Sequence, residues 1–235
     1  MPPVGFWGSS TMSLGGGVLS FFTPAAALEN DTLIAIIVAP AVPTTPDGWE
    51  LSDSFAAGAP VSMALAVFRR RVAIGEPAVH AFSGLLYPGL PDAIGMCLLY
   101  RGMQAEAALV GAEHALVASS TTHTAPAVTL TTYSDADLLV FYARDAGGAA
   151  AATVPAVARQ RGSTVHGAAG NGGGSLAVAE YLPEFAGATD PLSCTWSVAA
   201  AGIAAQVALA ADPMISAPVL VADVPGAIGL PKVGV

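Results

Sequence analysis

Short apolar runs that end at glycine, proline, asparagine or aspartate divide this chain along most of its length. The clearest run covers residues 31–39, is rich in isoleucine and stops at Pro40. Proline cannot donate a backbone hydrogen bond inside a sheet, so the chain has to leave the sheet there. Short apolar runs between such turn signals are typical of antiparallel β proteins. The sequence therefore predicts an all-β fold.

The same pattern recurs often enough to fill two packed sheets. The predicted strands are residues 18–23, 31–39, 49–53, 61–71, 78–83, 93–100, 127–132, 137–143, 175–182, 193–198 and 203–209. Roughly ten strands predict one antiparallel β-sandwich of jelly-roll type over residues 1–211. The last two strands are expected to turn around Ala201 and Gly202.

Two segments compete with this interpretation. Residues 103–117 carry apolar side chains at a spacing near 3.6, which favours a helix. Residues 146–159 are rich in alanine but contain Gly147, Gly148 and Pro155, so at most a short helical turn is expected there.

One internal echo connects two distant parts of the chain. Residues 30–35 (NDTLIA) resemble residues 135–140 (DADLLV), since both begin with an acidic turn that leads into an apolar strand. An aspartate can start such a strand by accepting a hydrogen bond from the backbone two residues on. The echo predicts two equivalent central strands, one in each sheet.

Composition excludes several classes of function. The chain is 54% hydrophobic, only 11% charged, and carries a net charge of −9. Nucleic-acid binding requires a basic face, and only the run Arg69–Arg71 offers one; its place at a strand end favours a solvated charge cluster. Residues 192–211 are uncharged and long enough to span a bilayer, but their serine, threonine and glycine content favours strands. We expect neither nucleic acid nor membrane as a partner.

The ends and the cysteines give weaker signals. No basic residue precedes the first apolar run, so a secretion signal is not expected and the chain is predicted to stay in the cytoplasm until it is assembled. Cys97 and Cys194 each lie in an apolar stretch, which favours buried thiols, although a bridge between them stays open.

Catalytic and metal-binding patterns are missing from the sequence. The four histidines have no partner at catalytic spacing, and there is no nucleophile elbow, phosphate loop or zinc spacing. The sequence predicts no enzyme and no cofactor. The most plausible ligand or interface residues are the aromatic side chains Trp7, Trp49 and Tyr87, with Trp196 as a weaker candidate, because flat rings can stack on sugars.

Residues 212–235 differ in character from the rest of the chain. This segment contains four prolines and prefers an extended conformation. Its apolar side chains favour contact with a protein surface over exposure to water; they include Ile215, Val219, Leu220, Ile228 and Leu230. We predict an extended arm that docks on a neighbouring subunit.

Several short motifs occur in a recognisable order. They are residues 30–35 (NDTLIA), 46–51 (PDGWEL), the strand 62–70, Tyr100-Arg101-Gly102 and residues 135–140. Over about residues 1–210 the chain resembles a β-sandwich module of tail, fibre and other exterior virion proteins of tailed bacteriophages. In that family a glycine usually precedes the first aspartate, where this chain has Asn30, and the tryptophan at the Trp49 position is expected to pack into the sandwich. The resemblance implies a lectin-like fold and supplies no catalytic residues.

The expected function follows from the resemblance and the composition together. It is a structural subunit of a virion, either a capsid decoration or a tail-associated protein, that assembles with other virion proteins and with copies of itself. The alternative is a carbohydrate-binding module that recognises host surface glycans.

Overall fold

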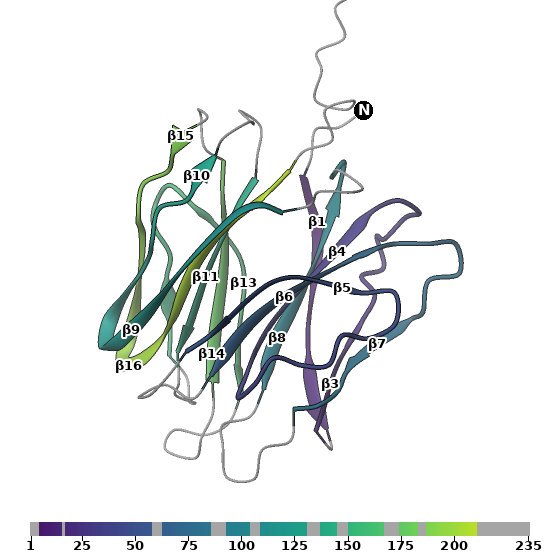
Figure 1. Ribbon diagram of the computed structural model, residues 1–235, viewed down its shortest axis with the longest axis horizontal. Helices are drawn as coiled ribbons and strands as arrows, with labels where there is room; N and C mark the ends of the chain where they lie inside the picture. Colours follow the sequence, from purple (N-terminus) through teal and green to yellow (C-terminus); the bar gives the residue numbers. More distant parts are fainter. Residues whose placement is uncertain are drawn as a thin grey trace, which may run out of the picture.

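The structure is a computed structural model, and it confirms the all-β prediction. It describes residues 5–15, 17–57, 63–85, 93–103, 109–130, 137–144, 150–166, 174–182 and 187–210. These residues form sixteen β-strands, all paired antiparallel, and no helix (Figure 1). The predicted C-terminal arm and Tyr87 lie outside the described residues.

The first large sheet uses strands from the N-terminal half of the chain. Its order is β1 (Gly5–Thr11), β8 (Ile94–Arg101), β4 (Thr32–Ala39), β6 (Ala64–Arg71) and β5 (Glu50–Ala56). A small sheet covers one face of it and consists of β2 (Ser13–Gly15), β3 (Val18–Phe22) and β7 (Val79–Phe82).

The second large sheet uses the C-terminal half. Its strands are β9 (Leu109–Ala125), β16 (Leu192–Leu209), β11 (Asp137–Arg144), β14 (Gly174–Tyr181) and β13 (Arg159–His166), with β12 (Ala152–Thr153) beside the start of β16. A separate short pair is made by β10 (Thr129–Leu130) and β15 (Gly187–Ala188).

Alternating side chains of the two large sheets form one shared core. Ile34, Ile36 and Leu98 of the first sheet lie in the same buried cluster as Phe141 and Val207 of the second. The side chains between them point the other way and build two outer clusters. The small sheet covers the outer cluster of the first half, and the beginning of β16 covers that of the second half. Both faces of the central strands are therefore buried, which explains why β4 is buried at every position and apolar from Leu33 to Ala39.

The two halves repeat one topology. The order β1-β8-β4-β6-β5 corresponds strand for strand to β9-β16-β11-β14-β13, and the pair β3–β7 corresponds to β10–β15. The echoed segments 30–35 and 135–140 fall on β4 and β11, and each of these strands is central in its own sheet. The prediction of two equivalent central strands is confirmed. The structure extends it from one strand to a duplicated unit of about a hundred residues.

Even the irregularities of the strands are duplicated. An extra residue interrupts the pairing at Trp7 in β1 and at Val110 in β9. A second one interrupts it at Ser52 in β5 and at Arg161 in β13. Such β-bulges bend a strand and increase its twist, so matching bulges give both sheets the same curvature at the same places.

Two predictions about local structure were wrong. Residues 109–117 belong to strand β9 and are not helical, because pairing with β16 outweighs their helix-like spacing. The predicted strands 193–198 and 203–209 are one strand, β16, which pairs with β9 on both sides of a bulge between Thr195 and Gly202. The bulge bends the strand where a turn was expected. Residues 150–159 form β12 and a turn, without a helix.

The apolar run at the end of the described chain thus lies in a sheet. Within the described residues, no helix is long and apolar enough to cross a bilayer.

Candidate functional site

Three of the motifs that carry the resemblance lie at one end of the first sheet: residues 30–35, the turn 46–51 and the segment 100–102. The Asp31 carboxylate accepts two hydrogen bonds from the Arg101 guanidinium, at 2.8 and 2.7 Å, and a third from the backbone N–H of Leu28 at 2.9 Å. This last partner lies three residues before Asp31, not two residues after it as predicted. The residue before it, Asn30, has a φ of 70°, a conformation that glycine adopts freely and asparagine tolerates. These contacts fix the loop between β3 and β4 to the end of β8.

The turn 46–49 lies at the same end and closes around an arginine. Arg70 donates a hydrogen bond from Nη1 to the Asp47 carbonyl at 2.8 Å. Gly48 has a φ of +75°, and a Cβ atom there would lie 2.2 Å from the same Nη1. The turn therefore requires glycine for its backbone conformation and for the close approach of Arg70.

Next to this turn is a shallow cleft of about 360 Å³. It is lined by Thr32, Gly48, Trp49, Glu50, Arg69, Arg70 and Arg71. Arg69 pairs with Glu50 at 2.7 Å, and Arg70 pairs with Glu76. Arg71 donates to the Met103 carbonyl at 3.0 Å and is exposed. Two of the three charges are therefore compensated by carboxylates, and the solvated cluster expected from the sequence is largely a set of structural ion pairs.

A buried polar cluster around His80 has the composition of a catalytic triad. Trp49 donates its indole N–H to His80 Nδ1 at 3.4 Å, so Nε2 is the nitrogen that carries the proton. This Nε2 lies 3.1 Å from Thr23 Oγ1 and 3.2 Å from a Glu76 carboxylate oxygen. The Thr23 hydroxyl donates to the Pro77 carbonyl at 2.6 Å. Thr23 thus accepts from the histidine, whereas a nucleophile activated by a histidine has to donate to it.

Burial supports the same assignment of protons. Desolvation lowers the pKa of His80 from its ordinary value of 6.5, against the opposing effect of Glu76 and with a smaller contribution from Arg70. The ring also stacks on Phe21, with centroids 5.1 Å apart. His80 is a neutral structural residue that joins β7, the end of β3 and the turn before β5.

A second histidine, His114, joins the two halves of the molecule. His114 of β9 lies 2.6 Å from the Asp53 carboxylate of β5, and its ring is parallel to that of Phe55 at 5.1 Å. On the equivalent seam between β1 and β13, the Arg161 guanidinium lies over the Phe6 ring at 4.5 Å. At both edges where the two large sheets meet, β5 with β9 and β1 with β13, a polar side chain thus packs against an aromatic ring.

The cysteines are chemically quiet. Both are free and buried, and they lie in different outer clusters, so the open question of a bridge is answered by their separation. Burial raises the pKa of Cys194 to about 11 and that of Cys97 well above its ordinary value. A thiol that stays protonated is a poor nucleophile and metal ligand. No group of three histidine, cysteine, aspartate or glutamate side chains with the geometry of a metal site occurs among the described residues.

Of the aromatic residues predicted as ligand or interface positions, the three that the structure describes differ in exposure. Trp49 is only 7% exposed and packs its ring edge-on against Phe21 and Phe82. Its burial removes it as a stacking surface and agrees with the packing that the resemblance implies. Trp7 is 44% exposed, but the Arg101 guanidinium lies 4.1 Å above its ring and covers one face. Trp196 is buried. Tyr87 and the five arm residues Ile215, Val219, Leu220, Ile228 and Leu230 lie outside the described residues.

The most unusual surface feature was not predicted. Four large apolar side chains are strongly exposed on two adjoining segments: Phe22 (71%), Leu28 (59%), Ile74 (84%) and Val79 (47%). Phe22 and Val79 are direct cross-strand partners on β3 and β7. The loop after β3 carries Leu28, and the loop before β7 carries Ile74. Backbone hydrogen bonds from Thr23 to Ala78 and from Asn30 to Val72 hold these two loops together. We call these four residues the apolar patch.

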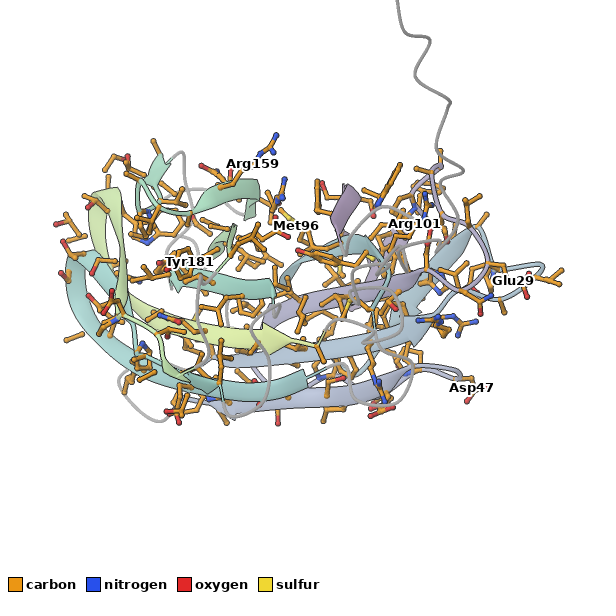
Figure 2. The ribbon with its side chains drawn as sticks, turned by 90° about the horizontal axis from the view of Figure 1, so that it is seen from above. Glu29, Asp47, Met96, Arg101, Arg159 and Tyr181 are labelled. Atoms are coloured by element: carbon orange, nitrogen blue, oxygen red, sulfur yellow. The ribbon has the colours of Figure 1, made fainter. Side chains whose placement is uncertain are left out.

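The apolar patch lies beside the ion-paired loops. Leu28 is adjacent to Glu29, and in Figure 2 Glu29, Asp47 and Arg101 are grouped at one end of the molecule, with Arg159 and Tyr181 toward the other. One signal in the sequence pointed to the patch. Phe21 and Phe22 are neighbours in a strand, so they face opposite sides of the sheet, and a sheet with only one covered face must expose one of them.

Comparison with known proteins gives no match: no family model fits the chain, and no curated protein or solved structure is similar to it.

Proposed function

We propose that this protein is a non-enzymatic structural subunit of a bacteriophage particle, a capsid decoration or tail-associated protein that acts by binding other protein subunits. The observation that carries the protein-binding part is the apolar patch. Large exposed apolar side chains that gather on a surface and are rimmed by polar groups mark sites of protein association. The bacteriophage part rests on the sequence resemblance, three of whose motifs lie beside the patch.

The chemistry of the buried polar groups supports a role without catalysis. In the His80 cluster, the imidazole accepts a hydrogen bond from Trp49 and the Thr23 hydroxyl donates to a backbone carbonyl, so no hydroxyl is activated by the histidine. Burial keeps both thiols protonated. The motif residues Asp31, Gly48 and Arg101 are occupied in fixing loops to strand ends. Rigid loops favour binding because less conformational freedom is lost when a partner docks.

A carbohydrate-binding module is the alternative that the sequence left open. Of the three tryptophans, only Trp7 is exposed enough to stack on a sugar, and the Arg101 guanidinium covers one face of its ring. The more exposed ring of Phe22 lies opposite Val79 in the apolar patch, where its neighbours are aliphatic and offer a sugar no polar partners. The geometry therefore favours a protein partner over a glycan.

The test is to look for the chain in particles. We expect quantitative mass spectrometry of particles, purified from cells that express the chain from its native genome, to find it in a fixed ratio to the major capsid or tail protein. Replacing Phe22 by Ser should lower that ratio several-fold, because it removes the largest side chain of the apolar patch. Val157→Ser, which changes an exposed valine in the other half, is the matched control. Particles without the chain would contradict the proposal.

A further inference from the structure

We propose that the apolar patch binds residues 212–235 of a neighbouring copy of this chain. The inference rests on the proposed function, since it names the partner of the surface that carries it. It predicts a head-to-tail contact in which each copy gives an arm and receives one.

The duplication supplies an internal comparison for the patch. The strand pair β3–β7 exposes Phe22 opposite Val79, while the equivalent pair β10–β15 exposes Thr129 opposite Ala188. The second half covers its sheet without large exposed apolar side chains on this pair. The fold therefore does not require them in the first half, and their exposure calls for a partner.

The chemistry of residues 212–235 matches that of the patch. The segment holds two aspartates and one lysine among 24 residues, and its apolar side chains recur along its length. Pro213, Pro218, Pro225 and Pro231 lack the N–H groups that a full strand in a sheet would need. Contact through apolar side chains, with the backbone extended, is the mode that this composition allows.

The positions of the two surfaces favour a neighbouring copy. The described chain ends at Ala210, directly after β16 of the second sheet, whereas the patch lies on the small sheet beyond the far face of the first. To reach its own patch, the arm would have to run back past the first sheet. The 25 residues after Ala210 extend over at most about 80 Å, which is ample for a direct contact with another copy. A donor and a receptor on different faces form a heterologous contact, the kind that builds rings and larger assemblies.

The test is photo-crosslinking on the full chain. A photoreactive amino acid replaces Leu220, and equal amounts of ¹⁴N-labelled and ¹⁵N-labelled chain are mixed before irradiation. We expect crosslinked peptides that join the two isotopes and map to residues 17–31 or 72–85. The same probe at the exposed Leu182 controls for random collision. Crosslinks confined to one isotope, crosslinks to another surface or the absence of crosslinks would each overturn the inference.

Variants of the receptor make the test specific. Phe22→Ser combined with Ile74→Ser should reduce the crosslink yield about tenfold or more, as expected when central apolar residues of a contact are removed. Val157→Ser combined with Val198→Ser, two exposed valines in the other half, should leave it unchanged. If the chain is present in particles but crosslinks elsewhere, the proposed function stands and this inference fails; if it is absent from particles, the function itself fails.

Discussion

At the scale of single residues, the turn 46–49 at the end of the first sheet depends on Gly48 and on the Arg70 side chain that packs against it. Gly48 provides both a positive φ and the space that the Arg70 guanidinium occupies. Gly75 has almost the same backbone conformation, with a φ of +74°, but nothing lies within 4 Å of the position that its Cβ would take. Substitution of Gly75 by alanine therefore tests backbone strain alone, whereas the same substitution at Gly48 adds steric crowding.

We predict different costs for the same substitution at these two positions. Gly75→Ala should lower the free energy of unfolding by about 1 kcal/mol, the cost of a left-handed conformation for a residue with a side chain. Gly48→Ala should lower it by about 1 kcal/mol more, because the Arg70 guanidinium has to move away and gives up its hydrogen bond to the Asp47 carbonyl. Urea denaturation of both variants measures the difference. Equal losses would show that the contact with Arg70 contributes nothing.

At the scale of elements, the small sheet and the turn before β5 are connected through His80. This residue of β7 contacts Thr23 after β3 and Trp49 before β5. Protonation of Nδ1 would remove the acceptor of the Trp49 N–H. The hydrogen bond between the small sheet and the turn before β5 therefore requires the neutral form of the His80 imidazole.

This leads to a prediction about acid. Because the pKa of His80 is lower in the folded chain than its ordinary 6.5, the unfolded chain binds the proton more readily. No stability is lost above pH 6.5, and the free energy of unfolding should fall as the pH drops below that value. NMR titration of the imidazole carbons should place the His80 transition below 6.5, with the exposed histidine of a denatured sample as reference. A transition at or above 6.5 would contradict the assignment.

At the scale of the whole molecule, two copies of one topology are joined by a single core. Side chains of β4, β6 and β8 interdigitate with those of β11, β14 and β16. Neither half can bury its inner face without the other. We therefore expect the halves to unfold together.

Fluorine NMR can test this cooperativity in one protein. With 5-fluorotryptophan, Trp49 reports on the first half and Trp196 on the second. Both signals should disappear at the same urea concentration. Phe141→Ala, which leaves a cavity in the shared core, should lower both midpoints equally and cost about 3–5 kcal/mol; Val157→Ala is the exposed control. Separate midpoints would show that the halves are independent units.

The sequence by itself determined the fold class, most strand positions and the equivalence of β4 with β11. Each of these follows from local patterns: apolar runs, turn residues and an echo of six residues. The tertiary structure decided what depends on pairing. Residues 109–117 became a strand because β16 lies beside them, and β16 stayed one strand because a bulge absorbed its bend. It also decided that Phe22, and not Phe21, is exposed, since the side that a strand presents to water depends on which sheet covers it. No local pattern carries that information.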